Sequence, residues 1–167
     1  MVDKIQITKT RRVKTPARGT AVAAGLDFFV PEDLTETDME KMFSKTGHPL
    51  DYVTGPDGFV SEFVIKPGQS ACIPSGIKAR LPHGYCMEFH NKSGVACKKS
   101  LLAGSCLIDE DYQGEWHIDV HNVSSVNAAH TLKRVFFPPP FSFLVLKRTG
   151  KKLAERTEKT YNMRVKK

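Results

Sequence analysis

The fold is indicated by residues 62–89, which read EFVIKPGQSACIPSGIKARLPHGYCMEF. Short apolar runs alternate there with Pro67-Gly68, Pro74-Ser75-Gly76 and Pro82-His83-Gly84, which supply the backbone angles that tight reversals need. Runs of about four to eight residues between such turns are typical of β-strands. The stretch therefore predicts an all-β architecture, a sandwich or a barrel.

The same rhythm continues on both sides of this stretch, except at residues 33–60. There, Thr37-Asp38-Met39-Glu40 has the spacing of a helix-start capping box, which predicts one short helix in an insertion on the β scaffold. The apolar periodicity predicts strands at 26–30, 62–65, 71–73, 77–81, 85–89, 115–121 and 141–146.

Length and composition exclude several classes of protein. A chain of 167 residues is the size of one domain, and its 40% hydrophobic and 26% charged residues are those of an ordinary globular protein. No apolar run approaches the roughly 18 residues of a membrane span, and Asp3 and Lys4 stand where a secretory signal needs apolar residues. The cysteines at 72, 86, 97 and 106 show no CxxC spacing, which predicts free thiols, a reducing cytoplasmic compartment and no structural zinc.

The net charge of +7 is concentrated in one part of the chain. Residues 1–130 hold 14 Lys and Arg against 16 Asp and Glu, whereas residues 131–167 hold 11 against 2. A basic tail can contact nucleic acid by neutralising phosphates. The body has no basic stripe interleaved with aromatic residues, so we do not expect nucleic-acid binding to be its function.

Two short clusters carry groups that can bind ligands. Ala24-Gly25-Leu26-Asp27 places a carboxylate after a flexible glycine, where it is either a hydrogen-bonding group at a strand start or a ligand. Asn91-Lys92-Ser93-Gly94-Val95 presents an ammonium group, a hydroxyl group and a bare backbone N–H in succession, which suits a phosphate. The alternative for the second cluster is an exposed polar turn.

A third cluster, SCLIDEDYQGE at residues 105–115, carries four carboxylates beside an aromatic ring. In an extended segment Asp109 and Asp111 would point to one face and Glu110 to the other. Leu107-Ile108 indicates a strand that enters the core, which makes Asp109 the best candidate for a buried, oriented general base. A charged hairpin turn is the alternative.

The histidines are weaker candidates. His117, Asp119 and His121 alternate along an expected strand, so they share one face and have the geometry for a metal site. Such residues more often face solvent, and no role is assigned to them.

Taken in order, the three clusters resemble the first three motifs of the trimeric deoxyuridine triphosphatases (dUTPases), as found in phages and large DNA viruses. The strand-turn-strand framework at 74–85 also resembles this family, and the resemblance extends over residues 5–133. It implies a jelly-roll β-barrel of the β-clip type, assembled as a homotrimer. It also implies Mg²⁺-dependent hydrolysis of dUTP to dUMP and pyrophosphate.

The resemblance further implies roles for individual residues. Asp109 would activate the attacking water, and Asp27 would contact Mg²⁺ through water, since the triphosphate itself holds most of the metal. Tyr112 would stack beneath the deoxyribose. The phosphates would be bound by Lys92, Ser93 and Gly94, and uracil by the hairpin of Cys106, Leu107 and Ile108.

The C-terminus departs from the family pattern. Residues 134–167 form an atypical basic segment after a domain of 1–133, in place of a fourth motif and a Gly-rich arm that closes over the nucleotide. This segment is either a native replacement or a shifted reading frame. An impaired dUTPase, or a nucleotide-binding or assembly protein of the same fold, is therefore the alternative hypothesis. A deoxycytidine triphosphate deaminase is disfavoured because the third cluster matches the diphosphatase pattern.

Overall fold

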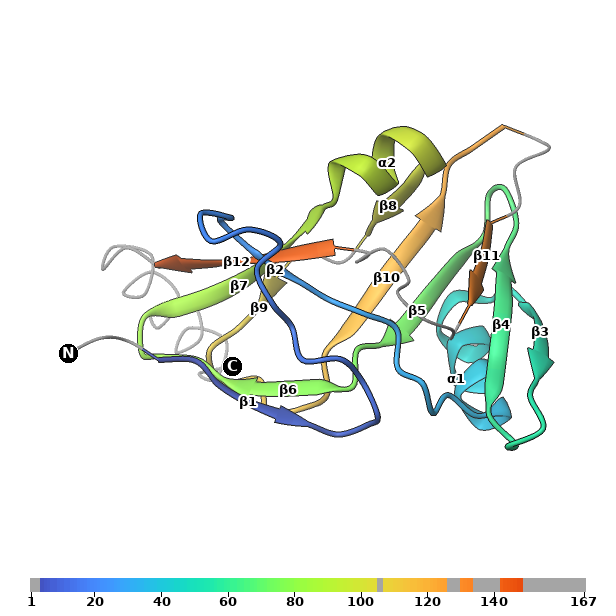
Figure 1. Ribbon diagram of the computed structural model, residues 1–167, viewed down its shortest axis with the longest axis horizontal. Coiled ribbons are helices and arrows are strands. Elements are labelled where there is room, and N and C mark those ends of the chain that lie inside the picture. The colour runs from blue at the N-terminus through green and yellow to red at the C-terminus, as the bar shows by residue number, and fades with distance from the viewer. Residues whose placement is uncertain (1–3, 105–106, 126–129, 134–141, 149–167) are drawn as a thin grey trace, which may run out of the picture.

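The computed structural model describes residues 4–104, 107–125, 130–133 and 142–148. These residues form a β-rich subunit with two short helices (Figure 1). The elements in chain order are β1 (Gln6–Lys9), β2 (Leu26–Asp27), α1 (Glu36–Thr46), β3 (Asp51–Thr54), β4 (Val60–Ile65), β5 (Ser70–Pro74), β6 (Ile77–Arg80), β7 (Tyr85–Asn91), α2 (Ser93–Lys99), β8 (Leu101–Ala103), β9 (Leu107–Ile108), β10 (His117–Asn122), β11 (His130–Lys133) and β12 (Ser142–Arg148).

The strands of the described residues pair in four small antiparallel sheets. Their orders are β1-β6, β5-β10-β8, β11-β4-β3 and β2-β12-β7-β9. In Figure 1, β3, β4, β11 and α1 lie together at one end of the molecule, and β7, β9 and β12 lie towards the other. The predicted all-β class is confirmed, as is the strand expected at Leu107-Ile108 (β9), and four strands that the sequence did not single out (β1, β3, β8 and β11) complete it.

The expected final strand at 141–146 is present as β12. It runs antiparallel to β7 along its whole length, with Ser142 opposite Asn91 and Arg148 opposite Tyr85. The backbone of residues 142–148 is therefore part of the same sheet as β2, β7 and β9. The remainder of 134–167 lies outside the described residues, and the division at residue 133 stays a prediction.

Helix α1 is present in the 33–60 insertion, but its predicted start was wrong. The capping box is formed by Thr35 and Asp38 rather than by Thr37 and Glu40: the Thr35 hydroxyl oxygen accepts from the Asp38 N–H at 3.3 Å, and Asp38 accepts from the Thr35 N–H at 2.9 Å. A tertiary contact favours this register, because Asp38 is also bound by a distant arginine that the local pattern does not reveal.

Helix α2 was not predicted. It begins at Ser93, directly after Lys92, and ends at Lys99, followed by the C-cap residue Ser100 in the left-handed conformation with φ 51°. A stretch of this length with Gly94 in its first turn has little helical signal of its own. Burial of Val95, which is 4% exposed, gives the helix its tertiary anchor.

The core lies between these sheets and centres on Phe28. Its ring contacts Phe89 edge-on at 6.1 Å and Trp116 at 6.0 Å between centroids. All three side chains are buried, so the start of β10 and the end of β7 are held around one aromatic cluster. Neither described helix is long and apolar enough to cross a membrane.

Candidate active site

A cavity of about 210 Å³ opens beside β9, and we call it the β9 pocket. It brings together four of the residues that the sequence singled out in the third cluster: Leu107, Ile108, Asp109 and Tyr112. Its lining is largely apolar or aromatic and consists of Phe89, Leu107, Ile108, Asp109, Tyr112, Trp116 and His117. An apolar pocket with one carboxylate and one phenol ring suits a planar organic ligand with a reacting polar group.

The acidic stretch after β9 is a turn, and the expectation of an extended segment was wrong. The Tyr112 N–H donates to the Asp109 carbonyl oxygen at 3.2 Å, which closes the chain on itself. Ile108 is buried as predicted, at 8% exposure, but Asp109 is exposed and not buried. The physical reason is that Asp109 is the first residue after the sheet, where the chain turns away from the core.

Tyr112 is oriented by contacts within this turn. Its hydroxyl group donates to the Glu115 carbonyl oxygen at 3.1 Å, and its ring lies directly over Gly114. A Cβ atom at Gly114 would stand 2.6 Å from the phenol oxygen, which is too close for any other residue type. The ring remains 45% exposed at the mouth of the β9 pocket, so one face is available to a ligand.

The first two motifs meet in one ion pair. The Lys92 ammonium group lies 2.8 Å from each carboxylate oxygen of Asp27, and the side chains are 33% and 13% exposed. Gly19 stands beside this pair, where a Cβ atom would be 3.2 Å from the Asp27 carboxylate. The sequence pointed to both charged residues but not to their direct contact.

Ser93 and Gly94 follow Lys92 in the first turn of α2. A Cβ atom at Gly94 would have nothing within 4 Å, so the space in front of this backbone is open. Lys92, Ser93 and Gly94 therefore form an accessible cationic and polar group at the end of β7. We call these residues, with Asp27, the Lys92 cluster.

Within one chain, the Lys92 cluster lies at a distance from Ile108 and Asp109 of the β9 pocket. Ile108 pairs with Met87, and Lys92 follows five residues later, which is about 16 Å along an extended strand. Because β9 runs antiparallel to β7, Asp109 continues away from Lys92. Asp109 and Lys92 therefore lie on different sides of the middle of β7, where β9 pairs with Met87 and Glu88.

Glu115, the last carboxylate of the third cluster, has a structural position. It accepts from the Gly76 N–H at 2.7 Å and from Thr10 and Arg11 at 3.1 Å. Arg11 also donates to both carboxylate oxygens of Asp38, at 2.7 and 3.0 Å. This Arg11 network joins the chain after β1, the start of α1 and the end of the acidic turn.

The alternating residues of β10 do not form a metal site within the described part of the chain, where no group of three potential ligands occurs. His121 instead lies 2.7 Å from an Asp119 carboxylate oxygen, and the Nδ1 of His117 donates to the Glu115 carbonyl at 2.9 Å. Burial and the nearby charge of Lys45 lower the pKa of His117, which favours its neutral form.

Sequence reasoning missed three of the residues that line the β9 pocket: Phe89, Trp116 and His117. Trp116 had a usable signal, as the single tryptophan placed directly after the acidic turn. Cys106, the predicted hairpin residue, lies outside the described residues. The described cysteines Cys72, Cys86 and Cys97 are free thiols, as expected.

Comparison with known proteins identifies the family. A family model described as dUTPase matches residues 58–133, which include the second and third clusters. A deoxyuridine 5'-triphosphate nucleotidohydrolase of Chlamydia trachomatis is 39% identical over 61 residues, covering 35% of this chain and 42% of that enzyme. One of Finegoldia magna is 33% identical over 95 residues, covering 51% and 66%. The chain belongs to the dUTPase family.

Solved dUTPase structures share the fold over most of the chain. A dUTPase of Staphylococcus bacteriophage 80alpha, crystallised with dUpNHpp, has a TM-score of 0.63 at 16% identity and covers 89% of this chain and 84% of its own. The EIAV dUTPase has a TM-score of 0.59 at 19% identity, with coverages of 89% and 91%. The matches to the Chlamydia enzymes span less than half of those relatives.

Proposed function

We propose that this protein hydrolyses dUTP to dUMP and pyrophosphate in the cytoplasmic nucleotide pool. The observation that carries the proposal is the β9 pocket, where Asp109 and Tyr112 of the dUTPase third motif meet at the rim of an apolar cavity. Family membership and the position of the match at residues 58–133 support the same reaction.

The β9 pocket takes the nucleoside in this proposal. Tyr112 stacks against the deoxyribose with its exposed face, held by Glu115 and Gly114 from behind. The backbone of the hairpin at Cys106, Leu107 and Ile108 reads the uracil edge. A ring packed this closely against a sugar leaves no room for a 2′-hydroxyl group, which would distinguish dUTP from UTP.

The Lys92 cluster takes the phosphates, with Lys92 as the cation and Ser93 and Gly94 as hydrogen-bond donors. Since Lys92 lies about 16 Å along β7 from the residue opposite Ile108, and Asp109 continues away from it, we infer that a nucleotide is shared between two chains of a homotrimer. The pocket of one chain would face the Lys92 cluster of its neighbour.

Asp109 acts as the general base. Its carboxylate accepts a proton from water while the water oxygen bonds to the α-phosphorus, and the bond from that phosphorus to the bridging oxygen breaks to release pyrophosphate. Exposure in the single chain leaves Asp109 open to water until the nucleotide and a neighbouring subunit enclose it.

Mg²⁺ fits this site as a partner of the nucleotide rather than of a protein cage. The described residues contain no group of three potential metal ligands, and Mg²⁺ binds readily through phosphates, water and one or two carboxylates. Asp27 is the carboxylate beside the phosphate-binding residues and would accept hydrogen bonds from the metal's water shell. When bound, the metal would neutralise developing phosphate charge.

The test is pyrophosphate release from dUTP with Mg²⁺, measured beside dTTP, dCTP and UTP. We expect turnover selective for dUTP, loss of turnover with EDTA, and a fall in kcat of at least about a hundredfold for Asp109→Asn, the loss typical of a missing general base. Asp111→Asn removes a carboxylate from the same turn and is the matched control.

Binding of dUTP by the wild-type chain without turnover would contradict the proposal. That result would instead favour the arm-less nucleotide-binding protein. The single tryptophan, Trp116, lies in the wall of the β9 pocket, so its fluorescence reports nucleotide binding independently of hydrolysis.

A further inference from the structure

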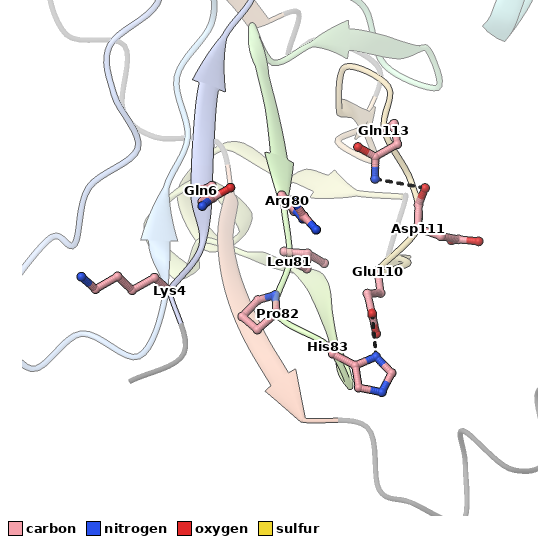
Figure 2. A pocket seen from close by; sticks show the side chains of 9 residues that line it. All are labelled: Lys4, Gln6, Arg80, Leu81, Pro82, His83, Glu110, Asp111 and Gln113. Atoms are coloured by element: carbon pink, nitrogen blue, oxygen red, sulfur yellow. Dashed lines mark hydrogen bonds and ion pairs between the residues drawn. The ribbon is translucent and has the colours of Figure 1, made fainter. Parts of the chain in front are cut away.

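Glu110 points away from the β9 pocket and ties the acidic turn to a distant part of the chain. One carboxylate oxygen accepts from the Gly84 N–H at 2.7 Å, and the other lies 2.9 Å from Nδ1 of His83. Figure 2 shows this side chain reaching from the turn to the His83 ring, next to Pro82. The hydrogen bond from the Gly84 backbone is the stronger anchor, because the His83 ring is 98% exposed.

Behind the turn lies a cavity and not a packed core. It has a volume of about 480 Å³ and separates Glu110, Asp111 and Gln113 from β1 and from Arg80 of β6 (Figure 2). Side chains on that side of the turn therefore have few packing partners to restrict their movement. The hydrogen bonds of Glu110 at the edge of the cavity therefore restrict the movement of the turn.

The contacts of Glu110 differ from those of its neighbours in the turn. Tyr112 donates to the Glu115 carbonyl, and Gln113 donates to the Asp111 carbonyl, so both stay within the turn. Glu110 instead reaches residues 26 and 27 positions earlier in the chain. It adjoins Asp109, whose own side chain is exposed.

The charge state of Glu110 suits this contact. Hydrogen bonds from the Gly84 backbone and from His83 lower its pKa, so it is ionised at neutral pH and accepts with both oxygens. A carboxylate that accepts a backbone N–H makes a charge-assisted bond, which is stronger than one between neutral groups.

We propose that Glu110, held by Gly84 and His83, is a positioning residue that fixes the direction of Asp109 in the β9 pocket. This inference rests on the proposed function. Tyr112 has its own support from Glu115 and Gly114, so release of Glu110 displaces Asp109 more than it displaces the stacking ring. The proposal therefore predicts that loss of the Glu110 contact lowers kcat without a comparable effect on nucleotide binding.

The experiment compares Glu110→Ala, Glu110→Gln and the matched control Asp111→Ala. We expect Glu110→Ala to lower kcat about tenfold with little change in KM, since small displacements of a reacting group cost one to two orders of magnitude. Glu110→Gln keeps an oxygen for the Gly84 N–H and should recover most of the loss, and Asp111→Ala should match wild type. Amide hydrogen exchange at Gly84 should accelerate in Glu110→Ala alone.

Each other result overturns the inference. Faster exchange at Gly84 with unchanged kcat would show that the contact exists but does not position Asp109, and unchanged exchange would show that there is no such contact in solution. An equal fall in kcat for Asp111→Ala would show that the loss of a negative charge from the turn causes the effect, and not the loss of the bond to Gly84. Wild-type chain without dUTP turnover would refute the proposed function and this role with it, whereas active wild type with an unaffected Glu110→Ala would refute this role alone.

Discussion

Gly114 and Tyr112 show how one residue type is required by a neighbouring ring. Because a Cβ atom at Gly114 would stand 2.6 Å from the phenol oxygen and 2.7 Å from Cζ, the ring can lie in this place only over a glycine. Gly114 is thus needed for the position of the Tyr112 ring rather than for an unusual backbone angle, since its φ is not positive.

Gly114→Ala should push the Tyr112 ring out of its position and weaken dUTP binding. Loss of a stacking contact worth about 1 kcal/mol predicts a rise in KM of about fivefold, with a smaller change in kcat. Steady-state kinetics on dUTP measure both values. Gln113→Ala alters the adjacent exposed residue, and an equal rise in KM for that variant would contradict the explanation.

Lys92 and Asp27 are a second case in which the position of one residue depends on another. The sequence indicated one as a phosphate ligand and the other as a partner of hydrated Mg²⁺, yet in the nucleotide-free chain each neutralises the other at 2.8 Å. In the proposed function, this salt bridge would hold both groups in place before the nucleotide arrives.

At the scale of elements, the Arg11 network joins three segments that are far apart in sequence. Arg11 spans 27 residues to Asp38 in α1 and 104 to Glu115 at the end of the acidic turn. Burial alone would raise the pKa of Asp38, but hydrogen bonds from Arg11 and Thr35 outweigh it and hold that pKa below its usual value. The insertion helix is therefore attached electrostatically to the turn that carries Asp109.

Asp38→Ala should lower the free energy of unfolding by about 2 to 3 kcal/mol, because it removes the side-chain half of the capping box and leaves Arg11 with one carboxylate partner. Urea denaturation at pH 7 measures the loss. Glu40→Ala, an exposed acid of the same helix, should change stability by less than about 0.5 kcal/mol. A similar loss in both variants would argue against the network.

The Asp38 contribution should also depend on pH. Its pKa is lowered on folding, so the stabilisation is complete above the unfolded value of about 3.9 and is lost as pH falls through the lower folded value. The difference in unfolding free energy between wild type and Asp38→Ala should therefore shrink below about pH 4. A difference that stays constant from pH 7 to pH 3 would contradict this.

At the scale of the whole molecule, the separation along β7 determines how the site is assembled. Lys92 lies about 16 Å along β7 from the residue opposite Ile108, so in the proposed function a second copy of the chain completes the site. The subunit presents exposed apolar side chains at the β9 pocket, where Leu107 is 51% and Tyr112 is 45% exposed.

Shared sites predict that two inactive variants restore activity when they assemble together. Asp109→Asn and Lys92→Ala should each be inactive alone, but random co-assembly should place an intact Asp109 against an intact Lys92 in about a quarter of the sites. Co-refolding followed by the pyrophosphate assay measures the recovery. Trimers without recovered activity would show that each chain holds its whole site.

The sequence by itself determined the fold class, the family and most of the chemical groups. Those properties depend on local patterns: turns such as Pro82-His83-Gly84, apolar runs of strand length, and contiguous motifs such as the one from Leu107 to Glu115. Asp109, Tyr112 and Lys92 could be named because a motif keeps its residues together in the chain.

Only the tertiary structure decided how those groups are held. The start of α1 and the bonds of Glu110 depend on partners that are distant in sequence. Helix α2 formed where propensity is low because Val95 is buried by other elements. The physical reason is common to all of them: contacts between residues far apart in the chain leave no periodic signal in the sequence.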